Sequence, residues 1–334
     1  MIAAELTPFE LPLHTPFRNS QGVTHSVHQP LLALSEHEVS GYGSVRGADL
    51  AELEAITEWL KPRSATESEL IRWELNAAGY SAAVRATVDI ALLDLRGRQQ
   101  GLSVRTMLGL DGGQPPPSAI SLPVAEPAET AAAARLLSKA PVLKLKVTPE
   151  TAIGAIRAVR SEYAGPIRID GNGSFSVAQA LHVIEQAADE LELFEQPTPA
   201  ADLAALAELH AASAVPIAAD ESVTGIAAIS ELAGKVSCVN LKMIRIGGLG
   251  EMLTALGLAR TLGLRVMLGS KLESSLGLTA VAQLAGLADY LDLDGASLLA
   301  DDFASGLTLS DGVLKLPTGP GLGCTMKREV RNKP

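Results

Sequence analysis

Five charged side chains recur at nearly even spacing through the middle of this 334-residue chain. They are Lys146, Asp170, Glu195, Asp220 and Lys242, which are 24, 25, 25 and 22 residues apart. Each lies at or just beyond the end of a short apolar run. About 25 residues suffice for one strand, one helix and two short loops, so the spacing predicts a repeated βα unit with its charges at the same end of every strand.

Three carboxylates between two amines predict a cation site with a base on either side. Asp170, Glu195 and Asp220 offer hard oxygen ligands that suit Mg²⁺, which Mn²⁺ can replace. Any one of them could instead cap the following helix, but three at matched positions favour a metal. Lys146 and Lys242 would flank the α-carbon of a bound substrate carboxylate, so that one removes the α-proton while the cation stabilises the enolate. A proton returned by the other lysine inverts the stereocentre, whereas a leaving group would give an elimination.

Three further residues lie next to these five. Lys144 is two residues before Lys146 on the same predicted strand, so both side chains point to one face. Two close ammonium groups disfavour each other's charge, which predicts a lysine pKa lowered toward the range of a useful base. Asn172 and Glu221 follow two of the carboxylates closely and are expected to support them.

Apolar runs predict eight strands, near residues 119–124, 142–147, 167–171, 191–195, 216–220, 237–243, 264–269 and 289–293. Ala-rich helical segments fill the gaps between them. This alternation favours a closed α/β barrel over an open doubly wound sheet, because only a closed ring brings five successive strand ends together.

The first part of the chain has a different pattern. Two extended segments, FELPLHTPF and QPLLALSEHEVSGYGSV, are joined by a polar stretch at 18–26, with Gly41 and Gly43 expected in turns. Helical apolar spacing predicts helices over 48–60, 66–78 and 82–98, the last of which ends at Gly101. We therefore predict an α+β domain over 1–112, a barrel domain over 113–316, and a segment over 317–334 that packs back on the first domain.

Composition excludes several classes of function. The net charge is −11 and no block of like charges is present, which argues against a nucleic-acid partner. Neither a signal peptide nor an 18-residue apolar span is visible, so we expect no membrane partner and a cytoplasmic location. The two cysteines, Cys238 and Cys324, do not indicate a disulfide framework. The six histidines lie away from the predicted strand ends and do not compete as catalytic groups.

Five motifs resemble the muconate-lactonizing subgroup of the enolase superfamily over essentially the whole chain. They are LKLKV, RIDGNGSF, FEQP, ADES and NLKMIRIGG, in this order and spacing. The resemblance implies an N-terminal α+β capping domain over a modified TIM barrel, (β/α)7β. It also implies that Lys146 and Lys242 are the acid/base pair, with Lys144 supporting Lys146, and that the protein forms homo-oligomers.

The last predicted strand ends in YLDLDG at 290–295, which resembles the Asp-x-Asp motif of dipeptide epimerases. There the two aspartates, here Asp292 and Asp294, bind the free α-ammonium group of the dipeptide. Side chains two residues apart on a strand share a face, and a carboxylate pair in a barrel mouth requires a cation. The resemblance therefore implies a dipeptide epimerase that inverts the α-carbon of the C-terminal residue of an L,L-dipeptide.

Three other residues are expected near the substrate. Glu273 resembles a residue that lines the site, and Lys271 lies where an apolar or small residue is expected. Arg18 belongs to TPFRNSQG (15–22), which resembles the family's mobile capping loop and is the predicted capping loop of this chain. Other activities of the subgroup remain as alternatives: o-succinylbenzoate synthase, muconate cycloisomerase and N-acylamino acid racemase. Their substrates lack the ammonium group, so they would not use the aspartate pair. A barrel that binds a small acid without turnover is an alternative of another class.

Overall fold

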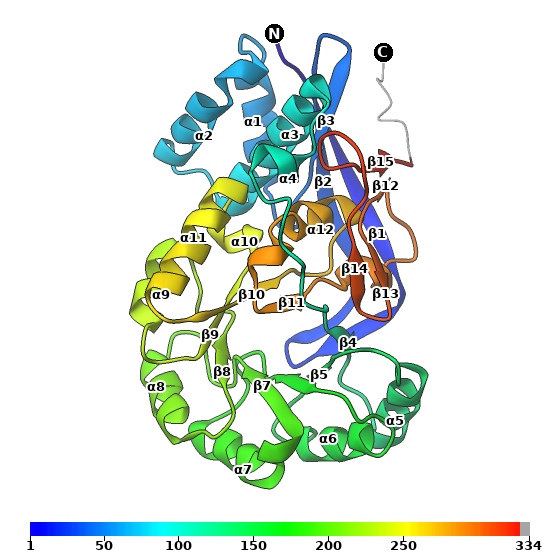
Figure 1. Cartoon of the computed structure of the whole chain (residues 1–334), viewed down its shortest axis with the longest axis vertical. Coiled ribbons are helices and arrows are strands. Elements are labelled where there is room, and N and C mark those ends of the chain that lie inside the picture. Colours follow the sequence, from blue (N-terminus) through cyan, green and yellow to red (C-terminus); the bar gives the residue numbers. More distant parts are fainter. Residues whose placement is uncertain (328–334) are drawn as a thin grey trace.

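The computed structural model of this chain describes residues 1–327. A ring of parallel strands forms its larger part, and an antiparallel sheet packed with helices lies at one end of that ring (Figure 1). The eight parallel strands are β4 (Ile120–Leu122), β5 (Leu143–Lys146), β6 (Ile167–Asp170), β7 (Leu191–Glu195), β8 (Ile217–Ala219), β9 (Cys238–Leu241), β10 (Arg265–Gly269) and β11 (Tyr290–Asp292). All eight predicted strands are therefore present.

The strands are hydrogen-bonded in sequence order from β4 to β11. A parallel bridge between Ser118 and Leu291 joins the first strand region to the last, and Ala119 N donates to Leu291 O at 3.0 Å. The predicted modified TIM barrel with an α+β domain is confirmed. In its register Lys146 pairs with Asp170 and Asp170 pairs with Glu195, which brings these chemical groups to one level of the ring.

Helices cover the outside of the barrel between successive strands (Figure 1). They are α5 (Pro127–Leu136), α6 (Ala152–Arg160), α7 (Val177–Ala187), α8 (Leu203–Ala212), α9 (Ile226–Leu232), α10 (Met243–Ile246), α11 (Leu249–Thr261) and α12 (Ser275–Ala282). In α7 the buried residues Ala180, Val183, Ile184 and Ala187 form one apolar stripe that faces the strands. Ser176 and Gln179 form a capping box that fixes where this helix begins.

The N-terminal part forms a three-stranded antiparallel sheet against helices. Its elements are β1 (Ala3–Asn19), β2 (Gly22–Glu36), β3 (Val39–Gly43), α1 (Leu50–Leu60), α2 (Ser68–Ala77), α3 (Ala82–Gln100) and α4 (Val104–Met107). The three predicted helices are present, and Gly101 ends α3 in the left-handed conformation with φ 69°.

One prediction for this sheet was wrong. The second extended segment is two strands, because His37 and Glu38 turn the chain with φ values of 52° and 64°. Gly41 and Gly43 lie inside β3 rather than in turns. A Cβ on Gly43 would lie 2.0 Å from the carbonyl oxygen of Thr87, so these glycines allow β3 to approach α3 closely.

The long β1–β2 hairpin reaches down to the barrel, and its turn lies beside β4 and β5 (Figure 1). Ser20 Oγ donates to Gly171 O at 3.3 Å, and Val124 N donates to Arg18 O at 2.9 Å. These contacts hold the hairpin turn, the predicted capping loop, over the end of the barrel where the charged residues lie.

After the barrel, the described part of the chain up to residue 327 forms four short strands and returns to α3. The strands are β12 (Ala304–Ser305), β13 (Thr308–Ser310), β14 (Val313–Lys315) and β15 (Thr325–Met326). Leu322 N donates to Asp94 Oδ1 at 2.7 Å, and Gly321 N donates to Leu102 O at 2.8 Å. The last seven residues of the predicted 317–334 segment lie outside the described residues, and the domain boundaries stay predictions.

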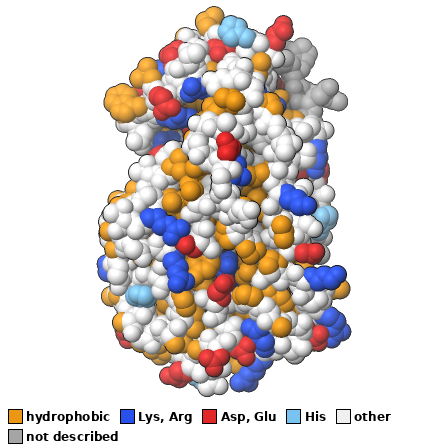
Figure 2. Space-filling view, in the orientation of Figure 1, with side chains coloured by type: hydrophobic (Ala, Val, Ile, Leu, Met, Phe, Trp, Pro, Cys, Tyr) orange, Lys and Arg blue, Asp and Glu red, His pale blue; other side chains and the backbone are white. Residues whose placement is uncertain are grey.

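Acidic and basic side chains are interspersed on the face that Figure 2 draws. Within residues 1–327, no helix is long and apolar enough to cross a bilayer.

Candidate active site

Three buried carboxylates lie at the carboxyl ends of adjacent strands. Asp170 and Glu195 are the last residues of β6 and β7, and Asp220 follows β8 directly. Their relative exposures are 0%, 0% and 2%, and one oxygen from each lies within 4.8 Å of the others. Buried carboxylates at this separation repel one another unless cations lie between them. Oxygen-only ligands of this kind can hold a hard divalent cation.

Lys144 and Lys146 both point from β5 toward these carboxylates, but at different depths. Lys144 is fully buried, with its Nζ 3.1 Å from Asp170 Oδ2, 2.7 Å from Glu195 Oε2 and 2.7 Å from Asp292 Oδ2. Lys146 lies nearer the opening and pairs with Asp170 Oδ2 at 2.5 Å. Lys144 therefore links the three-carboxylate cluster to the end of β11.

The expected lowering of a lysine pKa is wrong for both residues. Burial and the repulsion from Lys144 lower the pKa of Lys146, but Asp170, Glu195 and Asp292 together outweigh them, so the pKa is raised. Burial is likewise outweighed at Lys144 by Asp292, Glu195 and Asp170, which raise its pKa well above the ordinary value. Two neighbouring ammonium groups alone lower a lysine pKa, but the carboxylates that the other strands bring into direct contact reverse that effect.

Burial raises the pKa of each carboxyl group, and nearby cations lower it. The balance between these two effects differs from one carboxyl group to the next. Lys146 and Lys144 lower the pKa of Asp170 to about 2 against the effect of burial. Asp220 also has a lowered pKa, because Lys242 and Arg245 outweigh burial. Burial dominates at Glu195 and raises its pKa to about 7, although Lys144 opposes it.

The opposite side of the cluster carries Lys242 and two residues that the sequence analysis missed. Lys242 Nζ lies 2.7 Å from Asp220 Oδ2, and Arg245 pairs with the other oxygen of Asp220. Asn240 Nδ2 donates to Glu195 Oε1 at 2.9 Å. Both residues occur in the NLKMIRIGG motif, but only the fold shows that they reach the carboxylates.

The two supporting residues contact each other. Asn172 N donates to Asp170 Oδ1 at 2.9 Å, and Asn172 Nδ2 donates to Glu221 Oε1 at 3.0 Å. Asn172 adopts a φ of 44°, a conformation that asparagine tolerates better than most residues. Burial raises the pKa of Glu221, and the charges of Asp220 and Asp170 raise it further.

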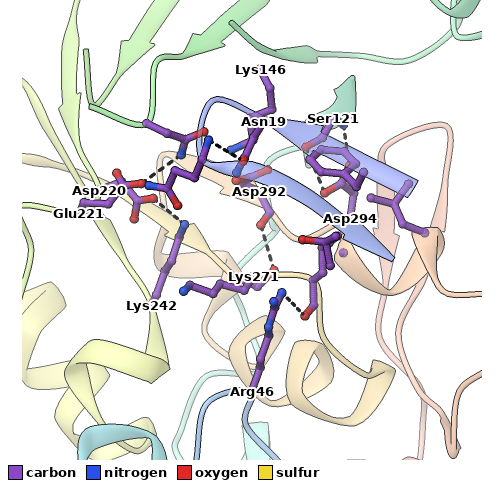
Figure 3. Close-up of a pocket in the computed structure, with 18 of the residues that line it drawn as sticks. Asn19, Arg46, Ser121, Lys146, Asp220, Glu221, Lys242, Lys271, Asp292 and Asp294 are labelled. Carbon is purple, nitrogen blue, oxygen red and sulfur yellow. Dashed lines mark hydrogen bonds and ion pairs between the residues drawn. The ribbon is translucent and has the colours of Figure 1, made fainter. Parts of the chain in front are cut away.

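A cavity of about 360 Å³ opens above this cluster, between the barrel end and the hairpin turn. Lys146 and Lys242 enter it from opposite sides, and Asp292 and Asp294 lie together on another part of its wall (Figure 3). Phe17 and Asn19 cover it from β1. Because side chains alternate along a strand, Arg18 lies on the other face, is exposed and is not among the residues that line the cavity.

Asp292 and Asp294 are buried, with exposures of 7% and 6%. Asp294 accepts hydrogen bonds from Ser121 N at 2.6 Å and from Ser121 Oγ at 3.3 Å, a partner that the sequence analysis missed. Burial, then the charge of Asp292, raises the pKa of Asp294 to about 6. Within the described residues, Asp292 Oδ1 is buried without a hydrogen-bond partner, so this wall offers an acceptor to a bound donor.

Lys271 lines the cavity, but Glu273 does not. Glu273 is buried behind the wall, where its Oε2 accepts a hydrogen bond from Arg46 N at 3.5 Å. Burial raises the pKa of Glu273 to about 7. Glu273 was expected to line the site; instead it holds the segment after β3 against the barrel.

Comparison with known proteins defines the family. Residues 126–330 match the family model described as Enolase C-terminal domain-like. The chain belongs to the enolase superfamily, as its motifs predicted. It is 30% identical to a hydrophobic dipeptide epimerase from Roseobacter litoralis, over 92% of this chain and 94% of that protein. It is also 30% identical to an L-Ala-D/L-Glu epimerase from Escherichia coli K12, over 91% of this chain and 97% of that protein.

A solved structure shares the complete fold. The dipeptide epimerase from Enterococcus faecalis V583, complexed with Mg and the dipeptide L-Leu-L-Tyr, has a TM-score of 0.89 and 26% identity. The similarity covers 97% of this chain and 99% of that chain. With these relatives, the protein is an isomerase of the racemase and epimerase class that acts on a small molecule.

Proposed function

We propose that this protein is a Mg²⁺-dependent dipeptide epimerase that inverts the α-carbon of the C-terminal residue of an L,L-dipeptide. The observation that carries the proposal is the carboxylate pair, Asp292 and Asp294, in a cavity that also contains two lysines on opposite sides. The relatives of this chain that act on dipeptides support it.

Asp170, Glu195 and Asp220 would hold the cation. The site fits a hard divalent ion because its ligands are three buried carboxylates within 4.8 Å of one another, surrounded by lysine and arginine. Mn²⁺ takes the same oxygen ligands and is expected to substitute. When bound, the divalent cation supplies positive charge that stabilises negative charge developing on the substrate carboxylate and competes with Lys146 for Asp170.

Lys146 and Lys242 would be the two bases of the inversion. In one direction Lys146 would act as the neutral amine that accepts the α-proton from one face of the substrate, and Lys242 as the ammonium that donates a proton to the opposite face. The other direction starts from the reversed protonation states and exchanges the roles. A positioned proton donor or acceptor contributes roughly 10²–10⁴-fold to a rate. Lys144, buried between the metal-site carboxylates and Asp292, would neutralise them and hold them in place.

Asp292 and Asp294 would bind the α-ammonium group of the dipeptide. The pKa of Asp294, raised to about 6, leaves it ionised at neutral pH, so that it can accept a charge-assisted hydrogen bond. This pair disfavours the synthase, cycloisomerase and N-acyl racemase alternatives. Lys144 already pairs with one oxygen of Asp292, but the substrates of those enzymes would leave Asp294 and the other oxygen of Asp292 without a cationic partner.

The test is incubation of an L,L-dipeptide library with the protein and Mg²⁺ in D₂O, followed by mass spectrometry and chiral analysis. An epimerase must introduce a single deuterium at the α-carbon that it inverts. If no dipeptide gains deuterium while the folded protein binds Mg²⁺, the proposal is wrong, and N-acylamino acids and succinylbenzoate precursors become the next substrates to test.

A further inference from the structure

Lys271 differs from the other basic residues of the cavity. The cavity is lined by Arg46, Lys146, Lys242, Arg245 and Lys271. Three of these pair with carboxylates of the metal cluster, and Arg46 Nη1 donates to Leu272 O at 3.2 Å. Lys271 makes no hydrogen bond or ion pair with any residue between 1 and 327. The cavity thus contains a cation without a protein partner, and a ligand can supply that partner.

Other cations surround Lys271. Burial lowers its pKa first, and the positive charges of Arg46, Lys242 and Arg245 lower it further, while the charge of Asp220 opposes them. The nearby carboxyl of Glu273 lies behind the wall against the backbone of Arg46 and does not form an ion pair with Lys271. Asp220 partly neutralises Lys242 and Arg245, but no carboxylate pairs with Lys271 or Arg46 within residues 1–327, so this side of the cavity attracts an anionic group.

Strand order defines where this cation lies relative to a substrate. β10 pairs with β9 on one side and with β11 on the other, and Lys271 follows β10 by two residues. It therefore lies between Lys242 on one side and Asp292 on the other. Its side chain extends toward Lys242, and the effect of Lys242 on its pKa agrees with that direction (Figure 3).

We propose that Lys271 binds a carboxylate in the side chain of the substrate's C-terminal residue, so that this epimerase prefers dipeptides that end in glutamate or aspartate. The proposal rests on the proposed function, which puts the inverted α-carbon beside Lys242 and the ammonium group at Asp292. From that α-carbon, a short acidic side chain directed along the wall reaches Lys271. Arg46 adds positive potential from the same side. The rival ligand is an apolar side chain against Leu272 and Leu298, which also line the cavity.

The test compares L-Ala-L-Glu with L-Ala-L-Gln, which has nearly the same shape but no side-chain charge. We expect the wild-type kcat/KM to be at least about 10-fold higher for the Glu dipeptide, the lower range for a charged hydrogen bond. In Lys271→Met this Glu-to-Gln ratio should fall by about 10-fold to 100-fold, and Lys271→Arg should retain most of it. Lys139→Met, an exposed lysine outside the cavity, is the matched control and should keep the wild-type ratio.

A wild-type ratio near one, or an equal ratio in Lys271→Met, overturns the role of Lys271 while the epimerase function stands. A preference for L-Glu-L-Ala over L-Ala-L-Glu overturns the assignment to the C-terminal residue. Calorimetric binding of L-Ala-L-Glu in the presence of Mg²⁺ separates the two proposals if no dipeptide is inverted. Weaker binding by Lys271→Met than by wild type then supports the anion site alone, and equal binding refutes it.

Discussion

Replacing Asp294 by asparagine tests the proposed ammonium site most directly. Both carboxylate oxygens of Asp294 accept from Ser121, one from its backbone N and one from its hydroxyl. An asparagine oxygen can keep the bond from the backbone N, and the Ser121 hydroxyl can rotate to accept from the amide nitrogen. We therefore expect Asp294→Asn to fold normally but to lose its negative charge toward the substrate.

The size of the effect follows from burial. Asp294 is 6% exposed, so solvent screens its charge little. A hydrogen bond to a charged group contributes roughly 1.5–3 kcal/mol, which corresponds to about 10-fold to 100-fold in kcat/KM. The proportion of ionised Asp294 also matters, and its pKa of about 6 makes pH 8 the suitable condition. Most of the loss should therefore appear for dipeptides with a free ammonium group.

Deuterium incorporation at the α-carbon, followed by mass spectrometry at pH 8, measures this loss. An N-acetylated dipeptide lacks the ammonium group, so the variant should discriminate less between free and acetylated substrates than wild type does. Asp311→Asn is the control, because Asp311 is exposed and its φ of 46° suits asparagine equally well. An Asp294→Asn enzyme within about threefold of wild type on free dipeptides would refute the ammonium assignment.

Three further predictions concern the bases, a buried acid and the sheet–helix contact. Lys146→Ala and Lys242→Ala should each abolish inversion, as measured by chiral analysis, while calorimetry should still detect Mg²⁺ binding. Inversion at the wild-type rate in either variant contradicts the two-base mechanism. Burial raises the pKa of Glu273 from about 4.5 to about 7, so the native state binds the proton more tightly and stability falls as pH rises through this window. Glu273→Gln should therefore gain more stability over wild type at pH 8 than at pH 5, by on the order of 3 kcal/mol in urea unfolding, and an equal difference at both pH values would contradict this. Gly43→Ala should lower the free energy of unfolding by about 3 kcal/mol, because its Cβ would lie 2.0 Å from a carbonyl oxygen of α3. Gly257→Ala is the control: a Cβ there would have nothing within 4 Å, so the free energy of unfolding should not fall.

The local sequence predicted the barrel well because each element carries its own signal. Short apolar runs and amphipathic helices repeat about every 25 residues, and parallel strands in a barrel bring their carboxyl ends together. The residue type at each strand end therefore predicted the oxygen-only cluster of Asp170, Glu195 and Asp220 before any contact was known. The hairpin was predicted less well, because His37 and Glu38 make a turn without glycine, and Gly41 and Gly43 are explained only by α3 packing on them.

The charge balance of the site could not be predicted from neighbours along the chain. Lys144 has a raised pKa because three carboxylates from distant strands contact it, and Arg245 and Ser121 reach their acidic partners only after the ring closes. Electrostatic interactions depend on distance and burial, which the barrel and the hairpin above it determine together. The amino-acid sequence by itself thus determined the fold, the three-carboxylate cluster and the pair of lysines beside it. Only the tertiary structure decided that Arg18 faces away from the cavity and that Lys271 enters it without a partner, because strand alternation and packing across the barrel mouth orient both side chains.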